Sequence, residues 1–187
     1  MNRTIKFRGK RLDNGEWVYG ELCTPRLFDS KRGYFGEDVP CIFCDEGNVP
    51  IIPESVGQFT GLLDNNGKEI YEGDILESFS VYLAYQQVGN YPPPNIEVEE
   101  YAIKRSINEV EFSYGSFNID GFPMMFEDMM NDGEEVDRTK ERQEFEEMWE
   151  DNSYDIRDKY PNLTWEDFYK PHIIGNIHDN PELLNEK

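Results

Sequence analysis

The chain has 187 residues, of which 37% are hydrophobic and 14% aromatic, enough to bury one core. Its formal net charge is −21 at pH 7, and so acidic a surface repels phosphate, which disfavours direct binding of nucleic acids or anionic membranes. The sequence shows neither a run of about 18 apolar residues nor a signal peptide. We therefore expect a cytoplasmic protein without a membrane span.

The cysteines Cys23, Cys41 and Cys44 are odd in number, so we expect free thiols and no disulfide framework. Cys41 and Cys44 have the C-x-x-C spacing of zinc knuckles, but zinc needs two further soft ligands. Only Cys23, His172 and His178 could supply these ligands, and they are scattered along the chain. We predict buried structural cysteines and no cofactor, and leave open whether Cys41 and Cys44 bind a metal.

The N-terminal third of the chain has β character. Residues 5–22 alternate apolar and polar side chains around Asn14-Gly15, which predicts a tight hairpin. Residues 24–49 are rich in glycine and proline and predict loops with short β pieces. The prolines in residues 49–53 favour an edge strand, because proline removes a hydrogen-bond donor from the sheet.

Residues 57–76, GQFTGLLDNNGKEIYEGDIL, form the most specific local pattern in the sequence. The run at positions 64–67, Asp-Asn-Asn-Gly, is a strong turn signal, so we predict a second hairpin here. Residues 77–89 are rich in β-branched and aromatic side chains and predict a long strand. After a proline tract, residues 96–104 and 108–114 alternate again and predict further strands.

The composition becomes acidic and helical later in the chain. Residues 127–151 contain twelve acidic side chains, and residues 134–151 lack Gly and Pro and predict an amphipathic helix. Residues 164–167, Thr-Trp-Glu-Asp, resemble a capping box and predict a second, short helix. Residues 172–177 predict a C-terminal strand, so the acidic helical region at about 126–170 is predicted to be an insertion before that strand.

Three motifs coincide in this chain. They are IKFRGKRLDNGEWVYGEL at 5–22, GQFTGLLDNNGKEIYEGDIL at 57–76, and IIGNIHDNPELL at 173–184. Together they closely resemble the YopX family of bacteriophage and prophage proteins. The resemblance implies a predominantly β fold with a small barrel-like core and an origin in a phage or prophage, and it supplies no reaction and no catalytic residues. We therefore predict a single mainly β (β-rich α+β) domain over residues 1–187, with an SH3-like barrel core built from the two hairpins and the C-terminal strand.

A few side chains are of the types that could form a catalytic or metal site. Glu72 and Asp74 could form an acid–base pair or hold a divalent metal in a hydrolase or nuclease accessory, although a strand bend more often places such acids in solvent or on the turn backbone. The oxygens of residues 64–67 lack the spacing of a calcium loop, which leaves a plain turn. His172 and His178 are six positions apart, and we expect no shared ligand or catalytic role for them.

We predict a non-enzymatic interaction module that binds a protein partner or itself. The candidate partner surface combines methionines in an acidic neighbourhood with the acids of the predicted helix. These residues are Met124, Met125, Met129, Met130, Glu144, Glu146 and Glu147. The net charge favours an alternative, an acidic mimic of nucleic acid that inhibits a host DNA-binding enzyme.

Overall fold

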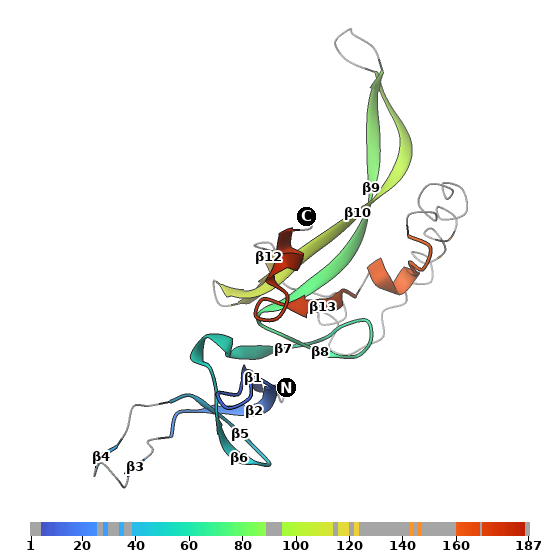
Figure 1. The fold of residues 1–187 in the computed structure, drawn as a ribbon. Helices are drawn as coiled ribbons and strands as arrows, with labels where there is room; N and C mark the ends of the chain where they lie inside the picture. The colour runs from blue at the N-terminus through green and yellow to red at the C-terminus, as the bar shows by residue number, and fades with distance from the viewer. Residues whose placement is uncertain are drawn as a thin grey trace.

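The computed structural model describes residues 5–25, 28–29, 34–35, 39–88, 95–113, 116–119, 122–123, 143, 146, 160–168 and 170–185. In this part of the chain the protein is mainly β, with short 3-10 helices between strands. Figure 1 shows two sheets that meet at the hairpin β7–β8, and a long ribbon, β9–β10, that extends away from both. None of the described helices has the length and apolar character needed to cross a membrane.

The N-terminal sheet has six strands. From edge to edge they are β6 (Gly47–Pro50), β5 (Cys41–Cys44), β2 (Trp17–Cys23), β1 (Phe7–Lys10), β7 (Gly57–Leu63) and β8 (Glu69–Tyr71). The proline-containing strand β6 lies at an edge, as its sequence predicts. Another short pair, β3 (Phe28–Asp29) with β4 (Tyr34–Phe35), stands apart from this sheet.

Turn chemistry explains the two hairpins of this sheet. Gly15 has a φ of +75° in the turn between β1 and β2, and Gly67 has a φ of +78° between β7 and β8. Asp64 Oδ1 accepts hydrogen bonds from the backbone N–H groups of Asn66 and Lys68, at 2.9 and 2.8 Å. Both predicted hairpins are therefore confirmed, and residues 64–67 form a plain turn fixed by a buried aspartate.

The C-terminal sheet has five strands. In order they are β12 (Phe122–Pro123), β11 (Ser116–Ile119), β10 (Asn95–Ser113), β9 (Asp74–Val88) and β13 (His172–Asn176). β10 runs without a break through the region for which the sequence predicts two strands, with one bulge between Val98 and Glu100. The short helices are η1 (Pro53–Ser55), η2 (Trp165–Phe168) and η3 (Pro181–Asn185).

Two hydrophobic clusters stabilise the body. The first contains Val18, Ile42, Val49 and Ile51 and lies within the N-terminal sheet. The second lies between the hairpin β7–β8 and the C-terminal sheet, and its buried residues are Leu62, Ile70, Leu76, Val110 and Phe117. The stretch 57–76 therefore joins the two sheets: its hairpin hydrogen-bonds to β1 and packs against the C-terminal sheet.

The mainly β prediction is confirmed, but the SH3-like barrel is not. In the described residues neither sheet closes, because β6 and β8 remain edges of the first sheet. The C-terminal strand β13 pairs with β9 in the other sheet, whereas the prediction placed it with the two hairpins. The predicted helix at 134–151 and most of the proposed insertion at about 126–170 lie outside the described residues.

Candidate functional site

The partner surface predicted from the sequence falls largely outside the described part of the chain. Only Glu146 of that set is described, and it is exposed. The remaining members are Met124, Met125, Met129, Met130, Glu144 and Glu147. This surface therefore stays a prediction.

Asp74, one of the two acids considered as a catalytic pair, is only 1% exposed. Its Oδ1 lies 2.6 Å from Arg8 Nη1, and its Oδ2 accepts a 2.8 Å hydrogen bond from the backbone N–H of Tyr71. Burial raises the pKa of Asp74, and the Arg8 guanidinium opposes that rise. Glu72 contributes its backbone carbonyl, which accepts a 3.0 Å hydrogen bond from Arg8 Nη2. Together the two residues hold an arginine.

Arg8 is stacked between two aromatic rings. Its Cζ lies 4.5 Å from the ring centre of Trp17 and 5.1 Å from that of Tyr71. Its Nε has no hydrogen-bond partner among the described residues. Gly57 leaves no spare room, because a Cβ there would lie 2.5 Å from the Glu72 carbonyl oxygen and 3.4 Å from Arg8 Nε. The rings of Trp17 and Tyr71 therefore take the place of water around the Arg8 guanidinium.

Arg8 is the middle rung of what we call the ionic ladder. Three alternate residues at the start of the chain share one face of the strand, and each pairs with an acid from a distant segment. The pairs are Lys6 with Glu69, Arg8 with Asp74, and Lys10 with Asp179. The three motifs at 5–22, 57–76 and 173–184 meet at this ladder.

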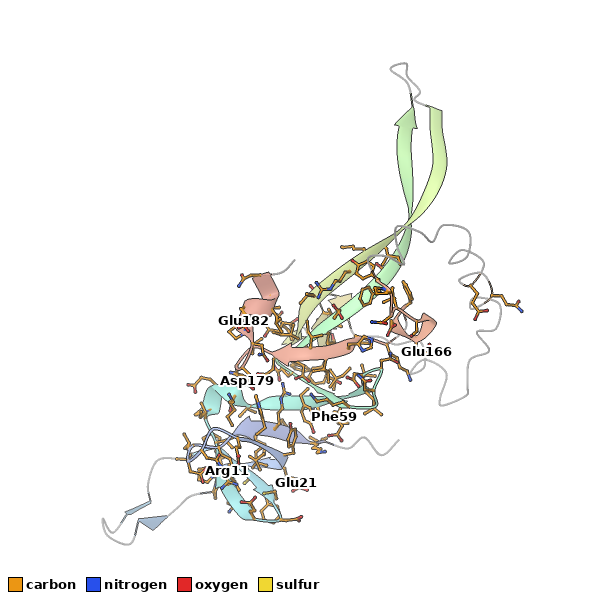
Figure 2. The ribbon with its side chains drawn as sticks, turned by 45° about the vertical axis from the view of Figure 1, so that its right-hand side comes forward. Arg11, Glu21, Phe59, Glu166, Asp179 and Glu182 are labelled. Carbon is orange, nitrogen blue, oxygen red and sulfur yellow. The ribbon has the colours of Figure 1, made fainter. Side chains whose placement is uncertain are left out.

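Asp179 anchors the C-terminal end of the ladder, beyond the end of β13 (Figure 2). The hydrogen bond from Lys10 holds the pKa of Asp179 well below its usual range, with further help from Asn176 and Trp17. Trp17 Nε1 donates to Asp179 Oδ2 at 2.8 Å. The ring of His178 lies 5.8 Å from that of Trp17, and burial together with nearby cations lowers the pKa of His178. His178 therefore lies beside the ladder, against the Trp17 ring.

The cysteine pair does not have the geometry of a chelate. Cys41 and Cys44 are three positions apart on β5, so they occupy opposite faces of the strand. All three cysteines are free thiols, and burial raises the pKa of the Cys41 thiol. Within the described ranges, no three His, Cys, Asp or Glu side chains are grouped so that they could hold a metal ion.

A cavity of about 540 Å³ lies beside the start of β9. Its wall combines apolar and polar side chains from four segments of the chain. They are Asn66, Glu77, Phe79, Arg105, Tyr160, Pro161, Asn162, Leu163, Asp167, His172, Ile173 and Ile174. This volume falls within the range of roughly 300–1,000 Å³ that is typical of ligand sites.

Asp167 and His172 form a hydrogen-bonded pair in the wall of this cavity. Asp167 Oδ1 lies 2.5 Å from His172 Nε2 and accepts a 2.9 Å hydrogen bond from Asn65. Asp167 Oδ2 accepts from the backbone N–H and the hydroxyl of Thr164. Burial tends to raise the pKa of Asp167, but these hydrogen bonds outweigh it and the pKa is lowered. One half of the capping box that the sequence predicts at 164–167 is thus present, the bond from the Thr164 amide to the Asp167 carboxylate, and the helix that it starts is one 3-10 turn.

The ionised Asp167 fixes the tautomer of the imidazole. A carboxylate only accepts hydrogen bonds, so Nε2 of a neutral His172 carries the proton and Nδ1 is left as an acceptor. His172 is a quarter exposed, whereas Asp167 is nearly buried. His172 lines the cavity and His178 contacts the ladder, so the two histidines serve different sites.

The ribbon β9–β10 is the most extended feature of the molecule (Figure 1). β13 pairs with β9 at residues 74–77, and β11 pairs with β10 at residues 110–113. Between these contacts and the tip, residues 78–88 and 95–106 pair only with each other among the described strands. We call this two-stranded segment the arm.

A model of the family described as YopX protein matches residues 6–124. The chain belongs to the YopX family. A search of curated proteins finds no match. The crystal structure of protein EF1440 from Enterococcus faecalis is 22% identical to this YopX-family chain, with a TM-score of 0.37 over 97% of this chain and 98% of that one.

The sequence alone does not predict the two polar pairs Arg8–Asp74 and Asp167–His172 of this YopX-family protein. Nothing in the local pattern of Arg8 indicates a buried partner 66 positions away in Asp74, because the alternation of β1 also fits a solvated cation. Asp167 and His172 had a usable signal. The capping pattern turns the Asp167 side chain back toward the N-terminus of helix η2. Only five positions separate Asp167 from His172, so the imidazole can reach the carboxylate.

Proposed function

We propose that this YopX-family protein is a non-enzymatic interaction module of a bacteriophage or prophage that acts in the host cytoplasm. Its partner is a protein with a basic and partly apolar surface, which docks on the arm. The single observation that carries this proposal is the strand register of the arm, which separates apolar from polar positions between its two faces.

Cα partners in the arm lie directly opposite each other and therefore on the same face of the ribbon. One face carries Phe79, Val81, Leu83, Tyr85, Gln87, Ile96, Val98, Tyr101, Ile103 and Arg105. The other face carries Ser80, Tyr82, Ala84, Gln86, Val88, Asn95, Glu97, Glu100, Ala102 and Lys104. Eight of the ten positions on the first face are apolar or aromatic, against four of ten on the second. We call the first the apolar face.

A two-stranded ribbon such as the arm gains little stability from its own contacts. An isolated two-stranded hairpin is marginally stable in water, and its outer edges present unpaired backbone groups to any further strand. The two hydrophobic clusters of the described residues lie in the body, and none of the arm residues whose side chains the structure describes, 78–80 and 103–106, belongs to them. Docking of a partner on the apolar face or along an edge would supply the missing stabilisation.

Charge identifies the kind of partner. The whole chain has a net charge of −21, and its residues 81–102 contain three glutamates and no lysine or arginine. Two copies of this chain would repel each other, whereas a basic protein would be attracted and steered toward the arm. We therefore favour a heterologous basic partner over a second copy.

The acidic surface also supports a second candidate, a nucleic-acid mimic that occupies the groove of a DNA-binding enzyme. Both candidates need a basic partner, and they differ in whether DNA competes for it. The predicted surface of Met124, Met125, Met129, Met130, Glu144 and Glu147, with Glu146, would extend the contact. The hydrolase alternative is disfavoured, because the carboxylate of Asp74 is engaged by Arg8 and the Tyr71 amide.

An arm-deleted variant tests the proposal. Residues 82–102 are replaced with Asn-Gly, which favours the tight turn of a hairpin. Tagged wild-type protein is used to capture bacterial host proteins, and binding of the purified, identified partner is then measured by calorimetry. We expect a basic partner that loses most of its affinity for the arm-deleted variant, while the circular dichroism of the body is retained.

Three outcomes decide between the candidates. An unchanged Kd for the arm-deleted variant contradicts the proposal. Sedimentation that shows an arm-dependent dimer of the pure protein replaces the basic partner with a second copy. Competition between duplex DNA and the wild-type protein for the same partner, weakened by salt, favours the nucleic-acid mimic.

A further inference from the structure

We propose that the cavity beside the start of β9 binds an alkylammonium or alkylguanidinium group, the chemistry shared by a lysine or arginine side chain and by small free amines. The inference deepens the proposed function and rests on it for one point only, that the cation is presented by the docked partner. The cavity lies at the base of the arm, because Phe79 and Arg105 belong to both and Glu77 directly precedes the arm in β9.

The walls of the cavity suit an aliphatic stem. The Phe79 ring packs edge-on against the Tyr160 ring, with centroids 5.5 Å apart, and Leu163 and Ile173 complete an apolar lining. Aromatic faces attract cations, and the methylene groups of a lysine or arginine bury well against such a surface. The volume of about 540 Å³ exceeds that of one side chain and leaves room for its flanking backbone.

The polar groups of the cavity are mainly acceptors. The ring of His172 directs Nε2 toward Asp167, so Nδ1 accepts a hydrogen bond whenever the imidazole is neutral. The exposed residues Asn66 and Asn162 add side-chain amides, each with an oxygen that can accept a hydrogen bond. Glu77 uses Oε1 to accept a 2.5 Å hydrogen bond from Arg105 Nε, and no described residue bonds to its second oxygen.

The charge balance of the lining also favours a cation. Arg105 and Glu77 neutralise each other in an ion pair that sits within the wall. Asp167 then leaves the lining with one negative charge when His172 is neutral. The remainder of the molecule reinforces this sign with a net charge of −21. An anion would meet two carboxylates and a single guanidinium, so we expect the cavity to reject it.

Isotope-labelled wild-type protein is titrated with n-butylguanidinium and n-butylammonium and followed by amide NMR. Butyrate and n-butanol serve as anionic and neutral probes of matched size. We expect saturable shifts with the two cations, centred on the amides of Leu163, His172 and Ile173, and none with butyrate or butanol. Absence of saturable shifts with either cation, or equal binding of butanol, overturns the proposal.

Two variants probe the lining, and each has a matched control. Glu77→Gln leaves Arg105 uncompensated and should weaken binding of the cations about tenfold or more. Glu182→Gln makes the same charge change on η3, on the other side of the C-terminal sheet from Glu166 and η2 (Figure 2), and should leave binding unchanged. Asn162→Lys places a tethered ammonium at the rim and should block binding, whereas Asn162→Gln should not. Equal effects of a variant and its control would overturn the proposal.

The same titration is repeated with the arm-deleted variant and with the acetylated tripeptide amide Gly-Lys-Gly. The arm-deleted variant keeps every residue of the cavity, so cation binding should persist even if the partner proves to dock elsewhere. Tighter binding of the tripeptide than of butylammonium assigns the cavity to a protein side chain. Tighter binding of butylammonium assigns it to a free amine. Glu77→Gln leaves the arm intact. If this variant also binds the identified partner more weakly, the cavity takes part in partner docking together with the arm.

Discussion

Arg8 Nη1 and Asp74 Oδ1 lie 2.6 Å apart at the junction of the two sheets, with side chains only 5% and 2% exposed. Arg8 belongs to β1 in the N-terminal sheet, and Asp74 begins β9 in the C-terminal sheet. Removing two charges from water is costly, so the pair is stabilising only while both members are present. This contact links the two sheets directly, in addition to the hydrophobic cluster between the hairpin β7–β8 and the C-terminal sheet.

Asp74→Asn should lower the free energy of unfolding by roughly 3–5 kcal/mol, because it leaves the buried guanidinium of Arg8 without a counter-charge. Urea unfolding at pH 7, followed by circular dichroism, measures this loss. Asp13→Asn is the matched control, since Asp13 pairs with Arg11 on an exposed turn. Because solvent screens that exposed pair, its loss should change stability far less. Similar losses for both variants would show that the buried pair has no special role.

Gly57→Ala tests the close packing around Arg8. The new Cβ would lie 2.5 Å from the Glu72 carbonyl oxygen, which is backbone and cannot rotate away. We expect a loss of about 1–3 kcal/mol in unfolding free energy, measured by thermal or urea unfolding. Gly15→Asn is the comparison, because Gly15 has open space around it and asparagine tolerates its φ of +75°. A Gly57 variant as stable as the Gly15 variant would argue against the tight junction.

Asp179 should make stability depend on pH in one direction. Its pKa is depressed in the folded protein, chiefly by the hydrogen bond from Lys10. The stabilisation is therefore fully present above the unfolded pKa of about 3.9 and is lost as the pH falls through the lower folded pKa. Wild type should be more stable than Asp179→Asn at pH 7, and the difference should shrink below about pH 4. Urea unfolding midpoints of the two proteins between pH 3 and pH 7 measure this difference. A difference that stays constant over this pH range would contradict the Lys10–Asp179 pair.

Asp167→Asn should disrupt the wall of the cavity. The amide cannot accept the four hydrogen bonds that Thr164, Asn65 and His172 donate to the carboxylate. We expect a loss of roughly 2–4 kcal/mol and faster hydrogen exchange at the Thr164 amide. The neighbouring exposed acid provides the control, as Glu166→Gln should change neither. Unchanged exchange at Thr164 in Asp167→Asn would contradict the assigned network.

The elements of the fold could largely be predicted from local chemistry, whereas their assembly could not. Asn14-Gly15 and the Asp64 turn determine their hairpins through backbone geometry that depends only on neighbouring residues. The sheet to which β13 belongs depends on a register with β9, about a hundred positions away, that no local pattern encodes. The barrel prediction failed for this reason.

The candidate sites show the same division. The spacing of Glu72 and Asp74 suggests an acid pair, but the partner of both is Arg8, which is covered by two rings from other strands. The cavity arises from four separate segments, so no motif could predict it. The apolar face of the arm requires both the register and the bulge after Val98, because a shift of one residue would mix the two faces.

Partner binding by two face-specific variants tests the central claim most directly. Leu83→Gln with Tyr101→Gln changes a directly paired position on the apolar face, and Tyr82→Gln with Ala102→Gln changes the adjacent pair on the opposite face. Neither variant alters the net charge. We predict that the first raises the Kd for the identified partner at least about tenfold, by loss of apolar contact area, while the second leaves it within about twofold. Equal Kd values for the two variants would contradict docking on the apolar face.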